Sequence, residues 1–339
     1  MSLWQAVVVF VVSAGVLVRA GSSLAGHADQ IADRTKMSRL FVGTLLLAFA
    51  TSLPELITEV TAARAGAPDL AVGDLLGSSM ANMAILAVID LMYRGKVWPA
   101  VELGHARVAA VAIALTAMVA LSIFTKTTFK IGWVGVTPIL IAFLYVVSIA
   151  WFRRMPLLAR PGLETPKITI QRPVGWSEEA ATRSLAGLWA RFGASALVIV
   201  ATAPVVTISV KVIADATGIA QTFLGAALLA VTTSLPELVA SVASVRIGAY
   251  DMAVGNLFGS NVANMSILLF SDIAYTQGPI LAAVSQTQII SALGAIVLMA
   301  IAVAAIVGES ETRIRKLEPD AIVLLIAYAG MMTAVALYG

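Results

Sequence analysis

The chain has 339 residues, of which 60% are hydrophobic and 12% are charged, and its mean hydropathy is +0.94. Soluble domains carry about 25% charged residues, so this composition excludes a soluble globular protein and indicates an integral membrane protein. The formal net charge is only +3, and we expect no nucleic-acid partner. Because the chain has no cysteine, disulfides and thiolate metal sites are excluded as well.

Stretches of about 20 mostly apolar residues, the length that crosses a bilayer as a helix, recur along nearly the whole chain. Alternating segments typical of barrel strands are absent, so an all-α fold is predicted. The first stretch lacks the basic n-region of a signal peptide, and we expect it to stay in the mature protein. We predict ten transmembrane helices, at 3–19, 40–63, 70–92, 107–124, 131–152, 192–212, 222–245, 252–274, 280–307 and 320–338.

The ten spans divide into two halves of five. Residues 1–152 form the first half and residues 192–339 the second. Residues 153–191 form the longest polar segment and contain four prolines. We interpret this segment as a cytoplasmic linker, because it is too short for a separate regulatory domain.

Lysine and arginine are unevenly distributed among the predicted loops. Of 22 such residues, counted with the loop that adjoins them where they lie at or near the end of a span, 18 belong to the odd-numbered loops and 4 to the even-numbered ones. The positive-inside rule then places the odd loops in the cytoplasm and both termini outside. Because five spans are an odd number, the second half is inverted relative to the first, as in many secondary transporters. We expect a multi-pass protein of a prokaryotic plasma (inner) membrane, in contact with lipid and with no obligatory protein partner.

One stretch of the sequence occurs twice. Residues 43–86 align with residues 225–268 without a gap, at a shift of 182 positions and with 26 identities in 44 positions. Each copy contains T-S-L-P-E-L, which places a glutamate, Glu55 or Glu237, inside an apolar segment. A carboxylate within a membrane span is costly, so it indicates a functional site.

The residues around each glutamate offer oxygen ligands. Pro54 and Pro236 interrupt their helices and leave main-chain carbonyls that must find a partner in the membrane. Hydroxyl and amide side chains share a helix face with this break or with the next helix, at spacings of three and four. They are Thr51, Ser52, Ser78 and Asn82 in the first copy and Thr233, Ser234, Ser260 and Asn264 in the second.

A set of ligands made only of oxygen suits a hard cation, Ca²⁺ or Na⁺, and argues against zinc or copper. The charge of two glutamates balances one Ca²⁺. Simultaneous binding of Ca²⁺ and several Na⁺ would be penalised in a pocket of low dielectric constant. Mutually exclusive occupancy of this kind is the physical basis of exchange.

Other acidic residues extend the pattern. Asp69 and Asp251 each stand at the start of a predicted helix, where we expect N-caps. Glu59 is one turn beyond Glu55 and aligns with Ser241. It is either part of the cytoplasmic ion pathway, where it would repel Glu55, or an interfacial charge.

Three further acidic positions have no assigned role. Asp74 aligns with Asn256 and is either near a helix start or a group that supports the ligands. Asp90 and Asp272 align with each other and lie two turns past the asparagine that ends the motif of each copy, so we expect them near the membrane surface.

The paired motifs, T-S-x-P-E followed by G-S-x-x-x-N, resemble the two alpha repeats of the sodium/calcium exchanger family, within the cation/calcium antiporter superfamily. The resemblance covers nearly the whole chain. It implies an antiporter that exchanges Na⁺ for Ca²⁺, not an enzyme, without a cofactor and with inorganic cations as its only small partners. It also implies alternating access, in which the helices at 3–19 and 192–212 slide across the other eight.

The resemblance also implies roles for single residues. Glu55 and Glu237 would be shared by Ca²⁺ and Na⁺, and Thr51 and Thr233 would offer their carbonyls to Ca²⁺. The inner Na⁺ site would comprise Ser52, Ser78 and the Ala48 carbonyl, and its outer mirror image Ser234, Ser260 and the Ala230 carbonyl. The middle of the site would be completed by Asn82 and Asn264.

The chain departs from the family at two places. The usual glycine before Thr-Ser is Ala50 in one copy and Thr232 in the other, which adds bulk beside the break. Some branches have an aspartate where this chain has Asn264, and its absence favours an exchanger that does not need potassium.

Three alternatives have to be weighed against Na⁺/Ca²⁺ exchange. A Ca²⁺/H⁺ or other divalent cation/H⁺ antiporter would not need the paired hydroxyls, and the G-N-x-x-E motif of proton-coupled relatives is missing, although Glu59 favours it. An intramembrane hydrolase would need a catalytic dyad or a pair of metal-binding histidines in the spans. A channel is disfavoured because two inverted halves give one site and no ring of ligands.

Overall fold

The computed structural model describes residues 1–93, 97–154, 184–217, 232–308 and 319–338, and most of them are helical. The helices of at least 18 residues are α1 (Leu3–Thr35), α5 (Pro68–Met92), α7 (Gly104–Thr125), α8 (Val136–Arg153), α10 (Leu185–Thr217), α13 (Tyr250–Ala274), α15 (Gln288–Val307) and α16 (Pro319–Tyr338). The shorter elements are α2 (Arg39–Phe41), the π-helix η1 (Val42–Leu47), α3 (Ala48–Thr51), α4 (Leu53–Arg64), α6 (Val97–Ala100), β1 (Lys130–Ile131), β2 (Val134–Gly135), α12 (Leu235–Arg246) and α14 (Ile280–Ala283).

All eight long helices are apolar enough to cross a membrane, so the described residues contain eight candidate spans. A ninth results if Arg39–Thr51 and Leu53–Arg64, which meet at an angle of 45°, count as one span. The helical membrane fold is therefore confirmed. Part of the predicted span 222–245 lies outside the described residues, as does most of the predicted linker 153–191, so the count of ten stays a prediction.

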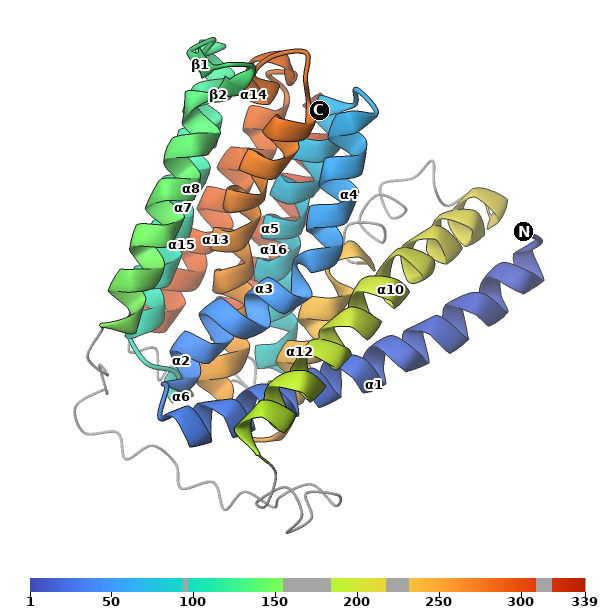
Figure 1. Ribbon diagram of the computed structural model, residues 1–339, viewed down its shortest axis with the longest axis vertical. Coiled ribbons are helices and arrows are strands. Elements are labelled where there is room, and N and C mark those ends of the chain that lie inside the picture. Colours follow the sequence, from blue (N-terminus) through green and yellow to red (C-terminus); the bar gives the residue numbers. More distant parts are fainter. Residues whose placement is uncertain (94–96, 155–183, 218–231, 309–318, 339) are drawn as a thin grey trace.

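The 33-residue helices α1 and α10 lie against each other on one side of the molecule and run in opposite directions (Figure 1). The predicted spans 3–19 and 192–212 are therefore too short. In α1, polar residues after the apolar stretch suggest a loop. However, Leu24, Ala28 and Ile31 recur at helical spacing and are buried. This stripe packs against the rest of the protein, and the helix continues along it.

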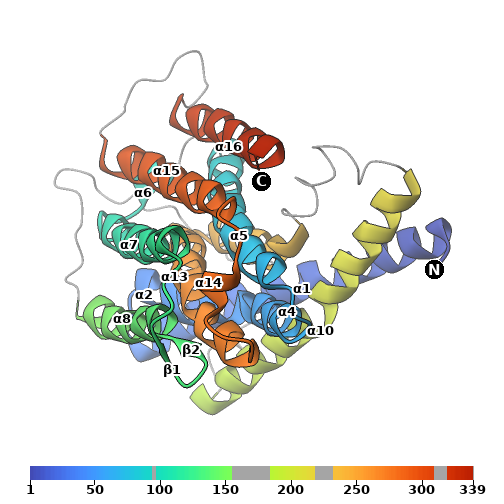
Figure 2. The ribbon, with the colours of Figure 1, turned by 90° about the horizontal axis from the view of Figure 1, so that it is seen from above.

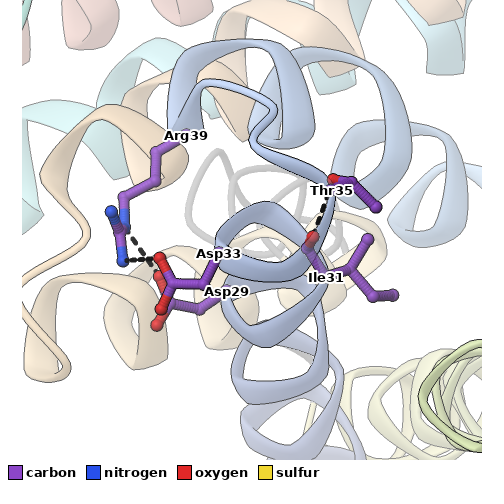
Figure 3. Close-up of polar contacts among 5 residues, drawn as sticks. All are labelled: Asp29, Ile31, Asp33, Thr35 and Arg39. Atoms are coloured by element: carbon purple, nitrogen blue, oxygen red, sulfur yellow. Dashed lines mark hydrogen bonds and ion pairs between the residues drawn. The ribbon is translucent and has the colours of Figure 1, made fainter. Parts of the chain in front are cut away.

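An ion-pair cluster closes the corner between α1 and α2 (Figure 3). The Arg39 guanidinium donates to Asp29 at 2.7 Å and to Asp33 at 3.0 Å. The Thr35 hydroxyl donates to the main-chain carbonyl of Ile31, one turn earlier in α1, at 2.7 Å. The cluster thus fixes the direction in which the broken span leaves α1.

Both proline-containing segments break where the sequence predicts. Ser52 leaves the helical conformation, with φ −89° and ψ 5°, and Pro54 is at the second position of α4. Ser234 has φ −89° and ψ 16°, and Pro236 is at the second position of α12. Because proline has no N–H to donate, each helix restarts after the serine. The two predicted helix breaks are confirmed, and they have nearly the same backbone geometry.

Helices α5 and α13 are the most buried of the candidate spans and lie in the middle of the bundle (Figure 2). Helices α7, α8, α15 and α16 surround them on one side, and α1 and α10 lie on the other. The outer helices expose large apolar side chains, such as Phe143 and Ile326, as expected for contact with lipid. The repeated motifs thus belong to the central, most enclosed part of the fold.

Asp69 and Asp251 do not cap the helices in which they lie, so that prediction is wrong. The N-caps of α5 and α13 are alanines, and both aspartates belong to the first turn. Asp69 accepts a hydrogen bond from the main-chain N–H of Ser285 at 2.7 Å. Asp251 accepts one from the N–H of Glu102 at 2.8 Å. Each aspartate thus fastens the start of its helix to a loop of the other half.

Asp90 and Asp272 are fully buried near the ends of α5 and α13, where each one holds the short helix that follows. Asp90 accepts from the N–H groups of Val97 at 3.1 Å and Trp98 at 3.4 Å. Asp272 accepts from the N–H of Ile280 at 2.6 Å, and its second oxygen accepts from that of Gly135 at 2.6 Å. These bonds give both aspartates a structural role at the ends of the bundle.

The loop before α7 yields a pH-dependent prediction. Burial raises the pKa of Glu102 to about 7, and the nearby negative charge of Asp251 adds to this shift. His105 also contacts Asp251, at 3.1 Å. The unfolded chain releases the Glu102 proton near the ordinary pKa of 4.5, whereas the folded state holds it up to a pKa of about 7. The contribution of Glu102 to stability is therefore greatest below a pH of 4.5 and is lost as the pH rises through about 7.

We therefore expect the thermal midpoint of the detergent-solubilised protein to fall between about pH 5 and about pH 8. The Glu102→Gln variant should show a smaller fall, because glutamine stays neutral across this range. Tryptophan fluorescence on heating provides the measurement. Equal pH slopes in the two proteins would contradict this explanation.

Candidate cation-binding site

Glu55 and Glu237 occupy the first turns of α4 and α12, directly after the two helix breaks. They are 3% and 1% exposed, so both are withdrawn from solvent. The partial positive charge of a helix N-terminus favours a carboxylate at each position. The two groups are near enough to interact electrostatically. The fold therefore brings both repeated glutamates to one buried place, although they are 182 residues apart in the chain.

Hydroxyl groups from both halves contact one oxygen of Glu237. Ser52 donates to Glu237 Oε1 at 3.3 Å, and Ser260 donates to the same atom at 3.5 Å. Ser52 belongs to the break of the first half, and Ser260 to the central helix of the second. These bonds place three of the predicted ligands within one cluster, and they leave Glu237 Oε2 without a partner in the described residues.

Six buried oxygens of the predicted ligands have no hydrogen-bond partner in the described part of the chain. They are Glu55 Oε2, Glu237 Oε2, Ser78 Oγ, Ser234 Oγ, Asn82 Oδ1 and Asn264 Oδ1. Unpartnered buried polar atoms are rare because each loses its hydration, at a cost of about 1–3 kcal/mol. The amide nitrogen of Asn264 and both carboxyl oxygens of Glu59 are without a partner as well. The six ligand oxygens can stabilise a hard cation by taking the place of its water shell.

Thr51 is fully buried, and the single proton of its hydroxyl has two acceptors within reach. Its hydroxyl is 3.2 Å from the Ala48 carbonyl oxygen and 3.2 Å from Asn256 Oδ1. The Ala48 carbonyl also accepts from the N–H of Ser52 at 3.0 Å. The role of the Ala48 carbonyl as an ion ligand stays a prediction, since this oxygen already accepts the Ser52 N–H and is one of the two acceptors open to the Thr51 hydroxyl. The second-half counterpart, Ala230, lies outside the described residues.

Helix register places the remaining predicted ligands. Ser78 and Asn82 are four residues apart on α5, and Ser260 and Asn264 have the same spacing on α13, so each pair shares a helix face. All four side chains are at most 1% exposed. Thr233, just before the second break, is half-buried. Its proposed carbonyl contact with Ca²⁺ stays a prediction.

Asn256 connects Glu237 with the first helix break. The sequence gives only a weak indication of this role. Its amide nitrogen donates to the Glu237 main-chain carbonyl at 3.3 Å and to Ser241 Oγ at 3.0 Å, and its oxygen contacts Thr51. The alignment suggests a supporting role because Asp74 occupies the matching position in the first half. The structure supports that interpretation for Asn256.

The matching positions of the first half carry two acids. Glu59 is fully buried, and neither of its oxygens receives a hydrogen bond from a donor in the described residues. The carboxyl group of Asp74 lies near enough for the two groups to interact electrostatically. In the second half, Asn256 donates a hydrogen bond to Ser241. In the first half, two carboxyl groups occupy the matching positions.

The described residues contain no group of three or more histidine, cysteine, aspartate or glutamate side chains that could hold a metal ion. The glutamates are supplemented by neutral hydroxyl and amide oxygens instead. A site with few charges and many neutral ligands suits an ion that must leave again, because binding that is too strong prevents release.

Comparison with known families agrees with this geometry. The profile of the family described as "Sodium/calcium exchanger protein" matches residues 5–153 and 187–337, which is most of the chain. The chain belongs to this family. Its members are membrane antiporters and not catalytic enzymes, so the predicted family resemblance is confirmed.

Individual relatives of the exchanger family are distant in sequence. The chain is 27% identical over 243 residues to the inner membrane protein YrbG of Escherichia coli K12, and the match covers 71% of each chain. It is 28% identical over 246 residues to the putative antiporter CaxA of Alkalimonas amylolytica, covering 71% of this chain and 72% of that one. A stretch of 56 residues is 46% identical to the sodium/calcium exchanger MaX1 of Methanosarcina acetivorans, 16% of each chain.

Solved structures of an exchanger named NCX_Mj share the fold. One of them, obtained with 100 mM Na⁺ and 10 mM Sr²⁺, superimposes with a TM-score of 0.68 and 17% identity, covering 96% of this chain and 97% of the other. Another, obtained with 2.5 mM Na⁺ and 0.1 mM Ca²⁺, gives a TM-score of 0.67 and 18% identity, covering 96% of both chains. At this identity the likeness establishes the arrangement of the helices.

Proposed function

We propose that this protein exchanges Na⁺ for Ca²⁺ across a prokaryotic inner membrane, by alternating access to a site between Glu55 and Glu237. One observation carries the proposal: six buried oxygens around the two helix breaks have no hydrogen-bond partner in the described chain. Two carboxylates balance the charge of one Ca²⁺, while several Na⁺ ions would use overlapping oxygens. The site can therefore hold one kind of ion or the other.

Selectivity and coupling follow from the same set of oxygens. Ser52 and Ser78 belong to the first half, and Ser234 and Ser260 belong to the second. We assign these pairs to Na⁺, because neutral hydroxyls suffice for a monovalent ion. Asn82 and Asn264 complete the middle of the site. No cofactor is needed, since the ion gradient itself drives the cycle.

We also propose ten spans arranged as two inverted repeats, with both termini outside the cell. The antiparallel course of α1 and α10 supports this arrangement, as does the position of α4 and α12 at opposite ends of the bundle (Figure 1). The reciprocal bonds of Asp69 and Asp251 support it as well, because each reaches the other half at a matching loop. Helices α1 and α10 would slide across the remaining helices to open the site alternately to each side.

Uptake of radioactive Ca²⁺ into proteoliposomes tests the proposal. Vesicles loaded with Na⁺ are diluted into Na⁺-free buffer, and vesicles loaded with K⁺ or with acid serve as parallel arms. We expect rapid Ca²⁺ uptake only into the Na⁺-loaded vesicles. Uptake that needs an acid interior and ignores Na⁺ would overturn Na⁺ coupling while leaving an antiporter.

A divalent cation/H⁺ antiporter is the second candidate, and the carboxyl pair of Glu59 and Asp74 favours it. Two ionised carboxylates repel each other and only accept hydrogen bonds, so a proton or a cation held between them would relieve the repulsion. Ser241 and Asn256 need neither, because the amide donates to the hydroxyl. The asymmetry gives the first half a proton-binding group that the second half lacks at the matching positions.

The double variant Glu59→Ser with Asp74→Asn separates the two candidates, because it gives the first half the residue pair of the second. Under Na⁺ coupling, we expect Na⁺-driven Ca²⁺ uptake to persist, since the new asparagine can donate a hydrogen bond to the new serine. Under H⁺ coupling, uptake into acid-loaded vesicles would be lost. Loss of Na⁺-driven uptake in a correctly folded double variant would contradict the first expectation.

A further inference from the structure

Asn261, which the sequence does not single out, connects the two central helices. It lies on α13 and is fully buried. Its amide nitrogen donates to the main-chain carbonyl of Ser79 on α5 at 3.2 Å. Its oxygen accepts from the amide nitrogen of Asn82 at 2.9 Å. The three groups form a relay that begins at a main-chain atom and ends at a predicted ion ligand.

The chemistry of the relay fixes the orientation of both amides. A main-chain carbonyl can only accept, so Asn261 must turn its nitrogen toward Ser79 and its oxygen toward Asn82. Asn82 must then use its nitrogen to donate to Asn261. Its own oxygen, Asn82 Oδ1, is left buried and without a partner in the described chain. An amide that would otherwise turn freely is thus held with oxygen available to a cation.

The other half has no such relay among the described residues. Asn264 is the repeat counterpart of Asn82, and neither its nitrogen nor its oxygen has a hydrogen-bond partner in that part of the chain. The residue that matches Asn261 in the first half is Ser79. The Ser79 hydroxyl donates to the Leu75 carbonyl of its own helix, at 2.9 Å, and does not reach across. Of the two amide ligands, Asn82 is therefore the one that is oriented.

We propose that Asn261 is a positioning residue for cation binding: it holds the Asn82 amide with its oxygen toward the ion and its nitrogen away from it. The assignment rests on the proposed function, since it concerns a ligand of the transported cation. An amide nitrogen carries partial positive charge, so a reversed Asn82 would repel the ion. Ca²⁺ should be affected most, because it requires six to eight oxygens.

Asn261→Ser tests the relay, because serine is the residue that the first half carries at this position. Loss of one oriented ligand is expected to lower the apparent affinity for Ca²⁺ by about tenfold, the value of one strong hydrogen bond. Ser79→Ala is the matched control. It removes a side chain at the relay but keeps the main-chain carbonyl that Asn261 uses, so its Ca²⁺ affinity should equal that of the wild type.

The Asn82→Asp background distinguishes positioning from a general structural role. A carboxylate presents oxygen in either orientation, so Asn261→Ser should cause no further loss of Ca²⁺ affinity there. Equal losses in the wild-type and the Asn82→Asp backgrounds would mean that Asn261 only supports packing, and this would overturn the proposal. So would wild-type affinity in Asn261→Ser. If the wild type itself neither binds nor transports Ca²⁺, the proposed function fails first, which is a separate result.

Discussion

Replacement of Glu237 by glutamine is expected to abolish Ca²⁺ uptake while the protein still folds. Glutamine keeps the size of the side chain but removes one of the two charges that balance Ca²⁺. It can also turn an amide nitrogen toward the ion, and Ser52 and Ser260 then lose the carboxylate that accepts their bonds. Removing one partner of a buried charge pair costs about 3–5 kcal/mol, which corresponds to at least roughly a 100-fold loss of affinity. The initial rate of Na⁺-driven uptake into proteoliposomes measures the effect.

Two further variants serve as a comparison and a control for Glu237→Gln. Glu55→Gln should lose transport in the same way, because the site needs both charges. Glu102→Gln makes the same chemical change in a loop outside the site and should transport Ca²⁺ normally. Size-exclusion profiles in detergent show whether each variant folds. Near-normal uptake by a folded Glu237→Gln protein would remove the central claim about the site.

The sequence predicts the helix breaks and the buried glutamates well, because the chain carries each of them twice. A single proline beside a glutamate could be an ordinary kink with an interfacial charge. Two gapless copies limit the choice, since a carboxylate in the membrane is costly each time it occurs. The structure places Glu55 and Glu237 in matching turns after matching serines, as the repeat suggests.

Other features depend on partners that are distant in sequence. The second half of α1 is polar enough to suggest a loop, and only its buried stripe against the bundle makes it a helix. The sequence predicts that Asp69 and Asp251 cap their own helices, but each binds a main-chain N–H from the other half. Asn261 differs from its repeat counterpart, so a search for identical positions passes over it. Such roles follow from the contact between halves, which a single helix does not reveal.

Close packing between the first broken span and α13 gives the second large expected effect. Gly259 on α13 lies against Thr44 of the π-helix η1. A Cβ atom at Gly259 would approach the Thr44 Cα to 2.6 Å and its carbonyl carbon to 2.8 Å. These are backbone atoms, which cannot turn aside as a flexible side chain can. Gly259→Ala must therefore push η1 away from α13.

We expect Gly259→Ala to lower stability by about 3 kcal/mol or more, the upper range for overpacking, and the thermal midpoint by roughly 6 °C or more. Transport should fall as well, because η1 leads directly into α3 and carries Thr51 and Ser52 with it. Gly15→Ala is the control, since nothing lies within 4 Å of its new methyl group. It should match the wild type in both heating and uptake. Wild-type heating and uptake in Gly259→Ala would contradict this prediction. They would show that close contact between η1 and α13 is not needed to keep the first break beside Glu237.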